Sequence, residues 1–303
     1  MSKIIKAIKN PKRVIQFVLA TPFGRVLTDK QYLKISYRLC IGKKLNLEEP
    51  RTFNEKLQWL KLNDRKKIYT QMVDKCTAKK LVADMIGEQY IIPTIAEWDS
   101  FDEIDFEALP DQFVLKCNHD SGGLVICTDK SKFDIEAARK KINKSLKTNY
   151  YWKGREWPYK NVKPRIIAEQ YMEDKSTAEL RDYKFFCFNG EAKVLFIATD
   201  RQNKNKETAF DFFDLDYKHL PIKNGHPFAE VLPEKPRKFD EMVVLAEKLS
   251  TGIPHVRVDF YEVDGKIFFG ELTFFQNSGM VPIEPEEWDY MLGDLINLPK
   301  ATK

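Results

Sequence analysis

The chain has 303 residues, of which 43% are hydrophobic and 31% charged, as in an ordinary soluble globular protein. Its 50 basic and 45 acidic residues leave a net charge of only +5, so we expect no nucleic-acid partner. The five cysteines are odd in number and include no close CxxC pair, which argues against a disulfide framework or a zinc site and favours reduced, cytoplasmic thiols.

The N-terminus, MSKIIKAIKNPKRVIQFVLATPFGRVL, combines basic residues with a short apolar patch and has no clear cleavage site. The chain contains no apolar run of the roughly 20 residues that a membrane helix needs. A packed amphipathic segment is the simplest interpretation, and peripheral attachment to an anionic membrane surface is the alternative. We therefore expect a cytoplasmic protein, with the inner face of the membrane as an alternative location. The sequence does not predict the oligomeric state.

The first third of the chain is predicted to be mainly helical. Residues 1–65 are expected to form a helical N-terminal segment, in which FNEKLQWLKLNDR gathers its leucines near one face. Residues 66–110 are expected to hold a further helix, VDKCTAKKLVADMIG, which Gly87 ends, and a linker.

The rest of the chain alternates hairpins with helices. We expect a strand, turn and strand in QFVLKCNHDSGGLVIC, and hairpins in DYKFFCFNGEAKVLFIATD and VRVDFYEVDGKIFFGELTF. The first of these two hairpins turns at Asn189-Gly190, a strong turn signal. Helices are expected in DIEAARKKINKSLKTNYY and KFDEMVVLAEKLSTG, and PRIIAEQYM is expected to be a short buried strand. This order predicts an α+β fold with antiparallel sheets and not a Rossmann alternation.

Two carboxylates stand out in the last hairpin, because Asp259 and Glu271 lie one in each arm of a mostly apolar stretch. Burying a lone carboxylate costs several kcal/mol, roughly, unless something pairs with it. Each carboxylate therefore meets a basic side chain, or the two together hold a divalent cation.

A lysine followed by a flexible turn stands out in KCNHDSGG. Lys116 ends a strand, and Ser121, Gly122 and Gly123 form a turn whose amides are able to face phosphate oxygens. An ordinary hairpin turn explains the same residues, and the Walker pattern does not fit because the lysine precedes the glycines. Lys184, flanked by aromatic residues in RDYKFF, either serves a site or extends its amine to solvent.

Taken in order, these motifs resemble the ATP-grasp superfamily. More closely, RTFNEKLQWLK, PDQFVLKCNHDSGG, DYKFFCFNG and GELTFFQNSG are similar to the TupA-like ATP-grasp family, and the resemblance covers about residues 25–299. That family is associated with cell-surface polysaccharide and teichuronopeptide synthesis, and many members carry a glycosyltransferase label. The resemblance implies an ATP-grasp fold of two lobes with antiparallel sheets that grip ATP: a small lobe at 111–172 and a large catalytic lobe with a metal site at 173–303.

The resemblance implies ATP and Mg²⁺ as cofactors and assigns roles to individual residues. Lys75 and Lys116 would hold the α- and β-phosphates, which the amides of Ser121, Gly122 and Gly123 would cover, and Lys184 would contact the γ-phosphate. The adenine would be bound by Glu169 and the backbone of Gln170, Tyr171 and Met172. Mg²⁺ would be held by Asp259 and Glu271, and a developing oxyanion by Arg257 and the turn at Gly279. Thr273 departs from the asparagine usual in ATP-grasp ligases, and Asn277 is a substitute metal ligand. Asp120 would repel ATP if it faced inward, so we expect it to point away or to contact the second substrate.

The implied reaction is ATP- and Mg²⁺-dependent ligation of a carboxylate to an amine through an acyl phosphate. Its expected substrates are a carboxylate-bearing sugar or sugar nucleotide and an amine acceptor. A glycosyltransferase that uses a sugar nucleotide, an ATP-dependent sugar kinase and a non-catalytic nucleotide-binding scaffold are the alternatives. The nearest metal-binding DxD pair for a transferase, DLD at 214–216, better fits a strand end or turn. The aromatic and basic stretch at 150–161 is a loop packed on the neighbouring lobe or part of the acceptor site.

Overall fold

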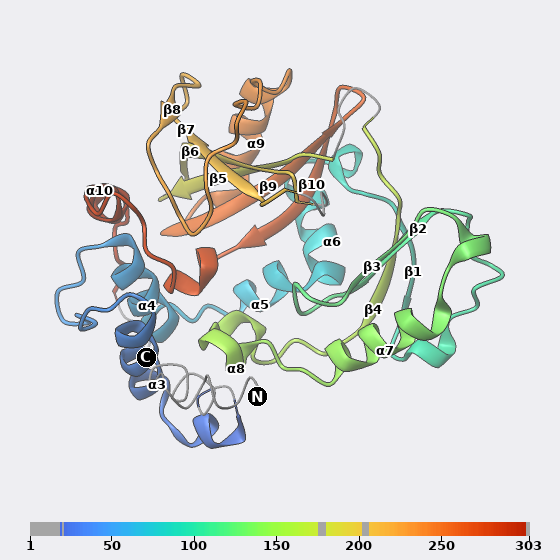
Figure 1. Cartoon of the computed structure of the whole chain (residues 1–303), viewed down its shortest axis with the longest axis horizontal. Helices are drawn as coiled ribbons and strands as arrows, with labels where there is room; N and C mark the ends of the chain where they lie inside the picture. Colours follow the sequence, from blue (N-terminus) through green and yellow to red (C-terminus); the bar gives the residue numbers. More distant parts are fainter. Residues whose placement is uncertain (1–18, 20, 175–179, 202–205, 301–303) are drawn as a thin grey trace.

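The computed structural model describes residues 19, 21–174, 180–201 and 206–300 (Figure 1). Most of the basic N-terminal stretch lies outside these ranges, so its peripheral attachment to a membrane stays a prediction. Within the described ranges, no helix is both long enough and apolar enough to span a bilayer.

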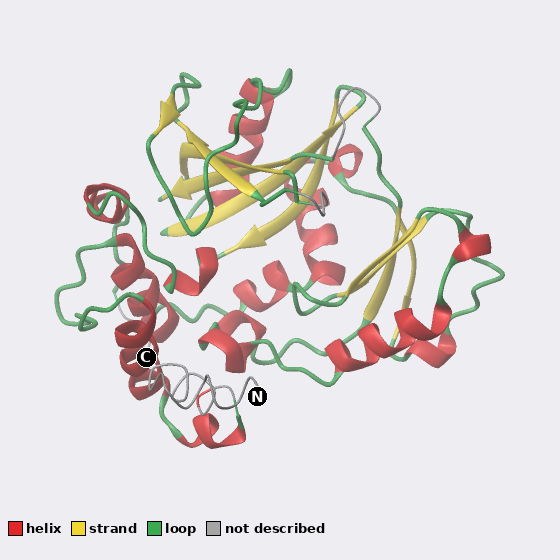
Figure 2. Ribbon diagram, in the orientation of Figure 1, coloured by secondary structure: helices red, strands yellow, loops and turns green. Residues whose placement is uncertain are grey.

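A four-stranded antiparallel sheet forms the small lobe (Figure 2). Its core is apolar and largely aromatic: Phe113 of the sheet packs edge-on against Phe133 with 5.2 Å between ring centroids, and Ile142 of the covering helix α7 is fully buried. In sheet order the strands are β1 (Thr94–Trp98), β4 (Ile166–Gln170), β2 (Phe113–Cys117) and β3 (Leu124–Cys127), and α7 spans Ile135–Leu146.

A six-stranded antiparallel sheet forms the large lobe, which confirms the predicted α+β class. Helix α9 (Phe239–Ser250) covers one face, where Phe239 lies 5.7 Å from Phe185 between ring centroids. Helix α4 covers part of the opposite face, where Phe53 lies 6.0 Å from Phe186. In sheet order the strands are β10 (Lys266–Thr273), β9 (His255–Val263), β5 (Asp182–Phe188), β6 (Glu191–Thr199), β7 (Ala209–Phe213) and β8 (His219–Leu220).

The remaining helices lie mainly beside and between the two sheets (Figure 1). They are α3 (Asp29–Cys40), α4 (Phe53–Asn63), α5 (Ile68–Val73), α6 (Lys75–Ile86), α8 (Tyr151–Gly154) and α10 (Glu287–Asp294). Short 3₁₀ helices lie at Pro22–Val26 (η1), Glu88–Tyr90 (η2), Phe101–Glu103 (η3), Lys130–Lys132 (η4), Trp157–Tyr159 (η5) and Gln276–Gly279 (η6). The helices predicted in FNEKLQWLKLNDR and VDKCTAKKLVADMIG are thus confirmed, and α6 ends at Gly87 as expected.

Helix α4 begins at a capping box. The Thr52 hydroxyl accepts a hydrogen bond from the Glu55 amide at 3.2 Å, and the Glu55 carboxylate accepts one from the Thr52 amide at 3.3 Å. The two bonds satisfy amides that a helix start leaves without partners. The first turn of α4 is also tied to α10, because the Asp289 carboxylate accepts from the Asn54 amide at 2.9 Å.

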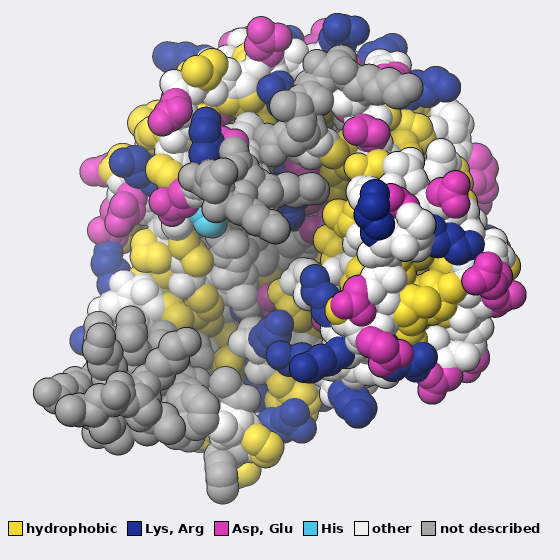
Figure 3. Space-filling model, turned by 45° about the vertical axis from the view of Figure 1, so that its right-hand side comes forward, with side chains coloured by type: hydrophobic (Ala, Val, Ile, Leu, Met, Phe, Trp, Pro, Cys, Tyr) yellow, Lys and Arg dark blue, Asp and Glu magenta, His cyan; other side chains and the backbone are white. Residues whose placement is uncertain are grey.

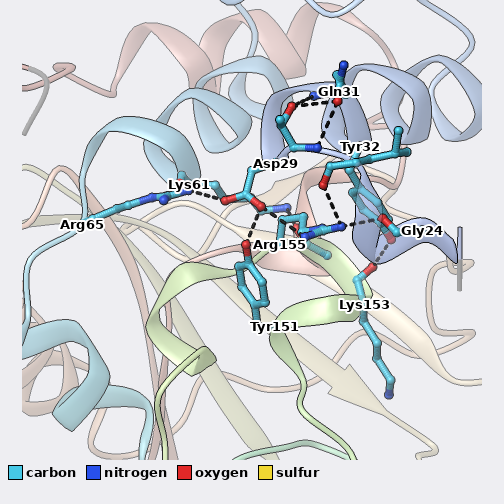
Figure 4. A network of polar contacts seen from close by, with 12 residues as sticks. Gly24, Asp29, Gln31, Tyr32, Lys61, Arg65, Tyr151, Lys153 and Arg155 are labelled. Atoms are coloured by element: carbon cyan, nitrogen blue, oxygen red, sulfur yellow. Dashed lines mark hydrogen bonds and ion pairs between the residues drawn. The ribbon is translucent and has the colours of Figure 1, made fainter. Parts of the chain in front are cut away.

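An ion network joins the N-terminal helices to α8 (Figure 4). Arg155 is buried, with one guanidinium nitrogen 2.7 Å from the Gly24 carbonyl oxygen and another 3.3 Å from the Asp29 carboxylate. Asp29 also accepts from Arg65 at 2.6 Å and from the Tyr151 hydroxyl. Burial alone would raise the pKa of Asp29, but Tyr151 and the two arginines hold it below its usual value. The network fixes α8, the first element of the 150–161 stretch.

Candidate active site

Alternation along β9 separates the core from the site. Val256, Val258 and Phe260 are fully buried in the core, and Phe260 contacts Phe185 on the α9 side of the sheet. Since successive side chains of a strand point to opposite faces, Arg257 and Asp259 face away from α9. We call this second side the site face.

A β-bulge brings the second carboxylate onto the site face. The hairpin pairs Phe269 with Phe260 and then Glu271 with Asp259, so that Gly270 is an extra residue in β10. If Gly270 instead paired regularly with Asp259, Glu271 would share the core face with Phe269, because positions two apart in a regular strand point the same way. The bulge therefore places the Asp259 and Glu271 side chains opposite each other.

Three neighbouring strands set a row of charged groups on the site face. Lys184 of β5 pairs in register with Asp259, and its amine lies 2.5 Å from the Asp259 carboxylate. Arg257 holds the same carboxylate with two nitrogens, at 2.7 and 2.6 Å, and reaches Glu271 at 3.1 Å. Burial would raise the pKa of Asp259, but Arg257 and Lys184 outweigh it and keep the pKa below its usual value.

Arg257 also connects the row to the turn that follows β10. Its guanidinium donates to the Gln276 side-chain oxygen, and the amide groups of Gln276 and Asn277 both donate to the Asn224 side-chain oxygen, at 3.2 and 2.7 Å. Asn277 is thus held by Asn224, whereas Thr273 donates weakly to Glu271 at 3.4 Å. Asn277 and Thr273 as metal ligands stay predictions. Asn224 and Gln276 were missed, and Asn224 carried no signal in the sequence.

The turn itself is left-handed. Asn277, Ser278 and Gly279 have φ angles of 45°, 56° and 58°. A Cβ atom at Gly279 would come within 2.4 Å of the Gln58 side chain, so both the backbone conformation and the close approach require glycine.

A cavity of about 680 Å³ lies between the lobes. Figure 3 shows apolar side chains on the small-lobe side of this hollow. Several predicted nucleotide-binding residues meet there, together with apolar residues of β2 and β3: the lining includes Lys116, Glu169, Gln170, Tyr171, Met172, Val114, Leu124, Ile126 and Tyr261.

Glu169 lies at the wall of this cavity between two lysines. Lys116 is 2.5 Å from one of its carboxylate oxygens and Lys79 is 2.6 Å from the other. Burial would raise the pKa of Glu169, but the two cations lower it below its usual value. Lys79 was not predicted as a site residue, although it lies four residues after Lys75 on α6 and therefore near the same helix face.

Hydrogen bonds within the small lobe hold the hairpin between β2 and β3. Asp120 accepts from the Gly123 amide at 2.9 Å and from the Ser145 hydroxyl, so its carboxylate is occupied by its own lobe. A Cβ atom at Gly123 would come within 2.4 Å of Ser145, which leaves room only for glycine. Lys75 donates to the Asp120 carbonyl oxygen at 2.6 Å and so lies against the hairpin. These contacts agree with Asp120 pointing away from a nucleotide.

The model of the TupA-like ATP-grasp family matches residues 55–297, which is most of the chain. The chain belongs to this family. No curated protein matches it. The solved structures that resemble this TupA-like protein include D-alanine–D-alanine ligase from Bacillus anthracis complexed with ATP (TM-score 0.38, 15% identity, 67% of this chain and 53% of that chain) and D-alanyl-alanine synthetase A from Vibrio cholerae (0.41, 15%, 79% and 62%). The ATP-grasp RimK domain protein from Sphaerobacter thermophilus is a third (0.40, 12%, 75% and 69%).

The TupA-like chain spans about half to two thirds of the length of these solved structures. TM-scores of about 0.4 do not support any conclusion about activity. Family membership therefore rests on the match of the sequence to the family model. The predicted resemblance to the family is confirmed, and the expected ATP-grasp architecture of two antiparallel sheets agrees with the strand order.

The donor set of the TupA-like site fits Mg²⁺. Asp259 and Glu271 offer carboxylate oxygens from paired positions, and 40% of the Glu271 side chain is exposed. The described residues contain no cluster of three or more His, Cys, Asp and Glu side chains able to hold a metal. Two carboxylates suffice for Mg²⁺, which commonly completes its shell with waters and substrate phosphates.

The 150–161 stretch borders the same site. The Tyr150 hydroxyl is hydrogen-bonded to Ser121 in the hairpin between β2 and β3, which we call the phosphate hairpin after its predicted role. Burial raises the pKa of Tyr150 to about 12, with Glu156 and Glu271 adding to the shift. Its ring lies 4.9 Å from that of Tyr159. This stretch therefore joins the predicted phosphate hairpin to the carboxylate row.

Proposed function

We propose that this TupA-like ATP-grasp protein is an ATP- and Mg²⁺-dependent carboxylate–amine ligase. The observation that carries the proposal is the row of Lys184, Asp259, Glu271 and Arg257 on the site face, in a family named for its ATP-grasp fold. Bound Mg²⁺ would offset the phosphate and carboxylate charges and orient the γ-phosphate.

The reaction has two balanced steps. A substrate carboxylate oxygen forms a bond to the γ-phosphorus of ATP as the bond to ADP breaks, which gives an acyl phosphate. An amine nitrogen then bonds to the acyl carbon, the carbon–oxygen bond to phosphate breaks, and the amine loses a proton. Phosphate and an amide are the products.

The protein contributes charge and position. Lys116, which lines the cavity, and Lys79, on the other side of Glu169, would meet phosphate oxygens once released from Glu169. Lys184 meets the transferred phosphoryl group, and Arg257 stabilises the oxyanion of the tetrahedral intermediate. Because Asp259 and Gln276 already orient Arg257, its guanidinium needs little rearrangement.

The substrates we propose are a carboxylate-bearing sugar or sugar nucleotide and an amine acceptor, in cell-surface polysaccharide synthesis. The family's association with such polymers supports this choice. So does the aromatic wall of Tyr150 and Tyr159 beside Glu271, because sugar rings stack on aromatic faces.

Thermal unfolding with Mg-ATP, Mg-ADP, UDP-glucose, UDP-glucuronate or metal alone tests the nucleotide, since a ligand that binds only the folded state raises its stability. A shift with adenine nucleotides that depends on Mg²⁺ is expected. ADP release is then measured with panels of sugar acids and amines, and the product is identified by mass. A phosphate ester instead of an amide would identify the alternative sugar kinase, and a shift with uridine nucleotides alone would favour the glycosyltransferase.

A further inference from the structure

The turn at 276–279 is held from outside its own hairpin. Two of its three successive left-handed residues, Asn277 and Ser278, are not glycine and store strain that the surrounding structure must hold. The last carbonyl groups of such a turn also lack partners within the turn, as at the end of any helical turn.

Helix α4 holds the backbone of this turn in place and supplies the hydrogen-bond donors that its carbonyl groups lack. The Gln58 side-chain amide donates to the Ser278 carbonyl oxygen at 3.1 Å and to the Gly279 carbonyl oxygen at 2.9 Å. The Lys61 amine donates at 2.8 Å to the Ser278 carbonyl oxygen and at 2.8 Å to its hydroxyl. Gln58 and Lys61 are both 0% exposed. The turn is thus capped by one side-chain amide and one cation, both from helix α4, which lies outside the β10 hairpin.

Lys61 also ties the turn to α8. Its amine donates to the Gly154 carbonyl oxygen at 2.8 Å, and the buried Glu156 carboxylate attracts it and is hydrogen-bonded to Ser278. Burial lowers the pKa of Lys61 to about 8 and raises the pKa of Glu156. A cation in this setting is costly to bury, and apolar packing of α4 does not require one.

We infer that Gln58 and Lys61 are positioning residues for the reaction. They hold turn 276–279 in place, and Gln276 of this turn orients Arg257. The inference rests on the proposed function. It assigns a role to the QWLK part of the RTFNEKLQWLK motif. Displacing the turn would move Gln276 and with it the Arg257 guanidinium, to which the proposed function gives the oxyanion.

The test compares Lys61→Met and Gln58→Met with Lys56→Met. Lys56 is a matched control, because it lies on the same helix and donates to two carbonyl oxygens, Gly293 at 2.8 Å and Ile296 at 3.0 Å, away from the turn. Three quantities are measured: amide hydrogen exchange of the peptide that covers 275–281, the dissociation constant of Mg-ATP, and kcat and KM for ligation.

We expect faster exchange at 275–281 in both test variants, kcat lower by about 10- to 100-fold, and a Mg-ATP dissociation constant within about twofold of the wild type. Lys56→Met should keep the exchange of this peptide and kcat. Unchanged exchange in both test variants would overturn the inference, as would faster exchange with unchanged kcat.

Two further results keep the test decisive. If Lys61→Met fails to fold because Glu156 loses its cation, the double variant Lys61→Met/Glu156→Gln removes both charges and must show the same faster exchange. Exchange is measured without turnover, so a wild-type protein that forms no amide with any substrate pair overturns the proposed function, while faster exchange at 275–281 still supports the hold of α4 on the turn.

Discussion

Glu169 keeps its charge because two lysines from different elements flank it. Lys79 comes from α6 and Lys116 from β2, and each holds one carboxylate oxygen. The three groups neutralise one another only in part, since two cations face one anion. The excess positive charge at the cavity wall suits a nucleotide polyphosphate.

Lys79→Met and Lys116→Met should therefore each weaken Mg-ATP binding by about 10- to 100-fold, where each factor of ten is about 1.4 kcal/mol. Titration calorimetry measures the change. Lys80→Met on the same helix is the control, because Lys80 is exposed and should leave the affinity unchanged. Wild-type affinity in Lys116→Met would contradict phosphate binding by this strand.

Asp259→Asn and Glu271→Gln should each lower Mg²⁺-dependent turnover at least about 1,000-fold, because each removes a carboxylate that is proposed to hold the metal. ADP release at saturating ATP checks this. The control is Glu262→Gln, a carboxylate on the same strand β9 whose partner is the Lys238 backbone amide. Full activity in either test variant would rule out the metal assignment.

At the residue scale, the sequence indicated which side chains stand out chemically better than it indicated which residues they contact. Asp259 and Glu271 were chosen because apolar hairpins seldom keep carboxylates, and the structure pairs them. Of the two competing explanations, the structure shows the basic partner, since Arg257 contacts both carboxylates, and the metal stays a prediction. Asn224 was out of reach, because its link to the site depends on a loop contact across 52 and 53 residues of sequence.

At the element scale, the strands and helices could be predicted from hydrophobic periodicity, but the register in which the strands pair could not. The turn at Asp264 and Gly265 starts β10 opposite β9 in a register that would leave Glu271 on the core face. The bulge at Gly270 corrects this by one residue. A bulge depends on packing along the sheet, so the order of residues alone did not reveal it.

Inserting an alanine between Gly270 and Glu271 should therefore abolish ligation, whereas substituting Gly270 should not. The added residue would pair with Asp259 and turn Glu271 and Thr273 toward the apolar side under α9, and we expect a loss of stability of several kcal/mol, roughly. Gly270→Ala keeps the residue count, and its Cβ atom would lie 3.1 Å from the Asp259 carbonyl oxygen, so a small loss is expected. Urea unfolding and ADP release of both variants test this, and an active insertion variant would contradict the role of the bulge.

At the scale of the whole molecule, a buried histidine links stability to pH. His255 packs between the aromatic rings of Phe53 and Phe188, and its Nδ1 atom lies 3.0 Å from the Cys187 carbonyl oxygen, to which it must donate. Burial lowers its pKa to about 3. The folded protein therefore keeps the ring neutral, while the unfolded chain takes up a proton below pH 6.5 or so.

The free energy of unfolding should fall as the pH drops from about 6.5 toward 3, by up to about 1.4 kcal/mol per pH unit from this group. Urea unfolding at pH 7, 6, 5 and 4 measures the slope. His255→Gln should be less stable at pH 7 but lose less stability on acidification, since glutamine does not titrate. An equal slope in both proteins would show that His255 is not the linked group.

The two-lobed architecture was the most predictable feature, because hairpin signals and helix stops recur along the chain. The role of α4 was not, since nothing in its amphipathic pattern distinguishes a helix that packs on a core from one that also caps a distant turn. Residues 58 and 61 contact a turn more than 200 positions away.

The aromatic stretch at 150–161 has an optical consequence. The chain has five tryptophans, and none falls in a described strand of the large sheet. Two of them, Trp152 in α8 and Trp157 in η5, lie in the stretch that is bonded to Ser121 through Tyr150. Movement of the phosphate hairpin onto a ligand would alter the surroundings of these two indoles, so the intrinsic emission of the unlabelled protein would report ligand capture in real time.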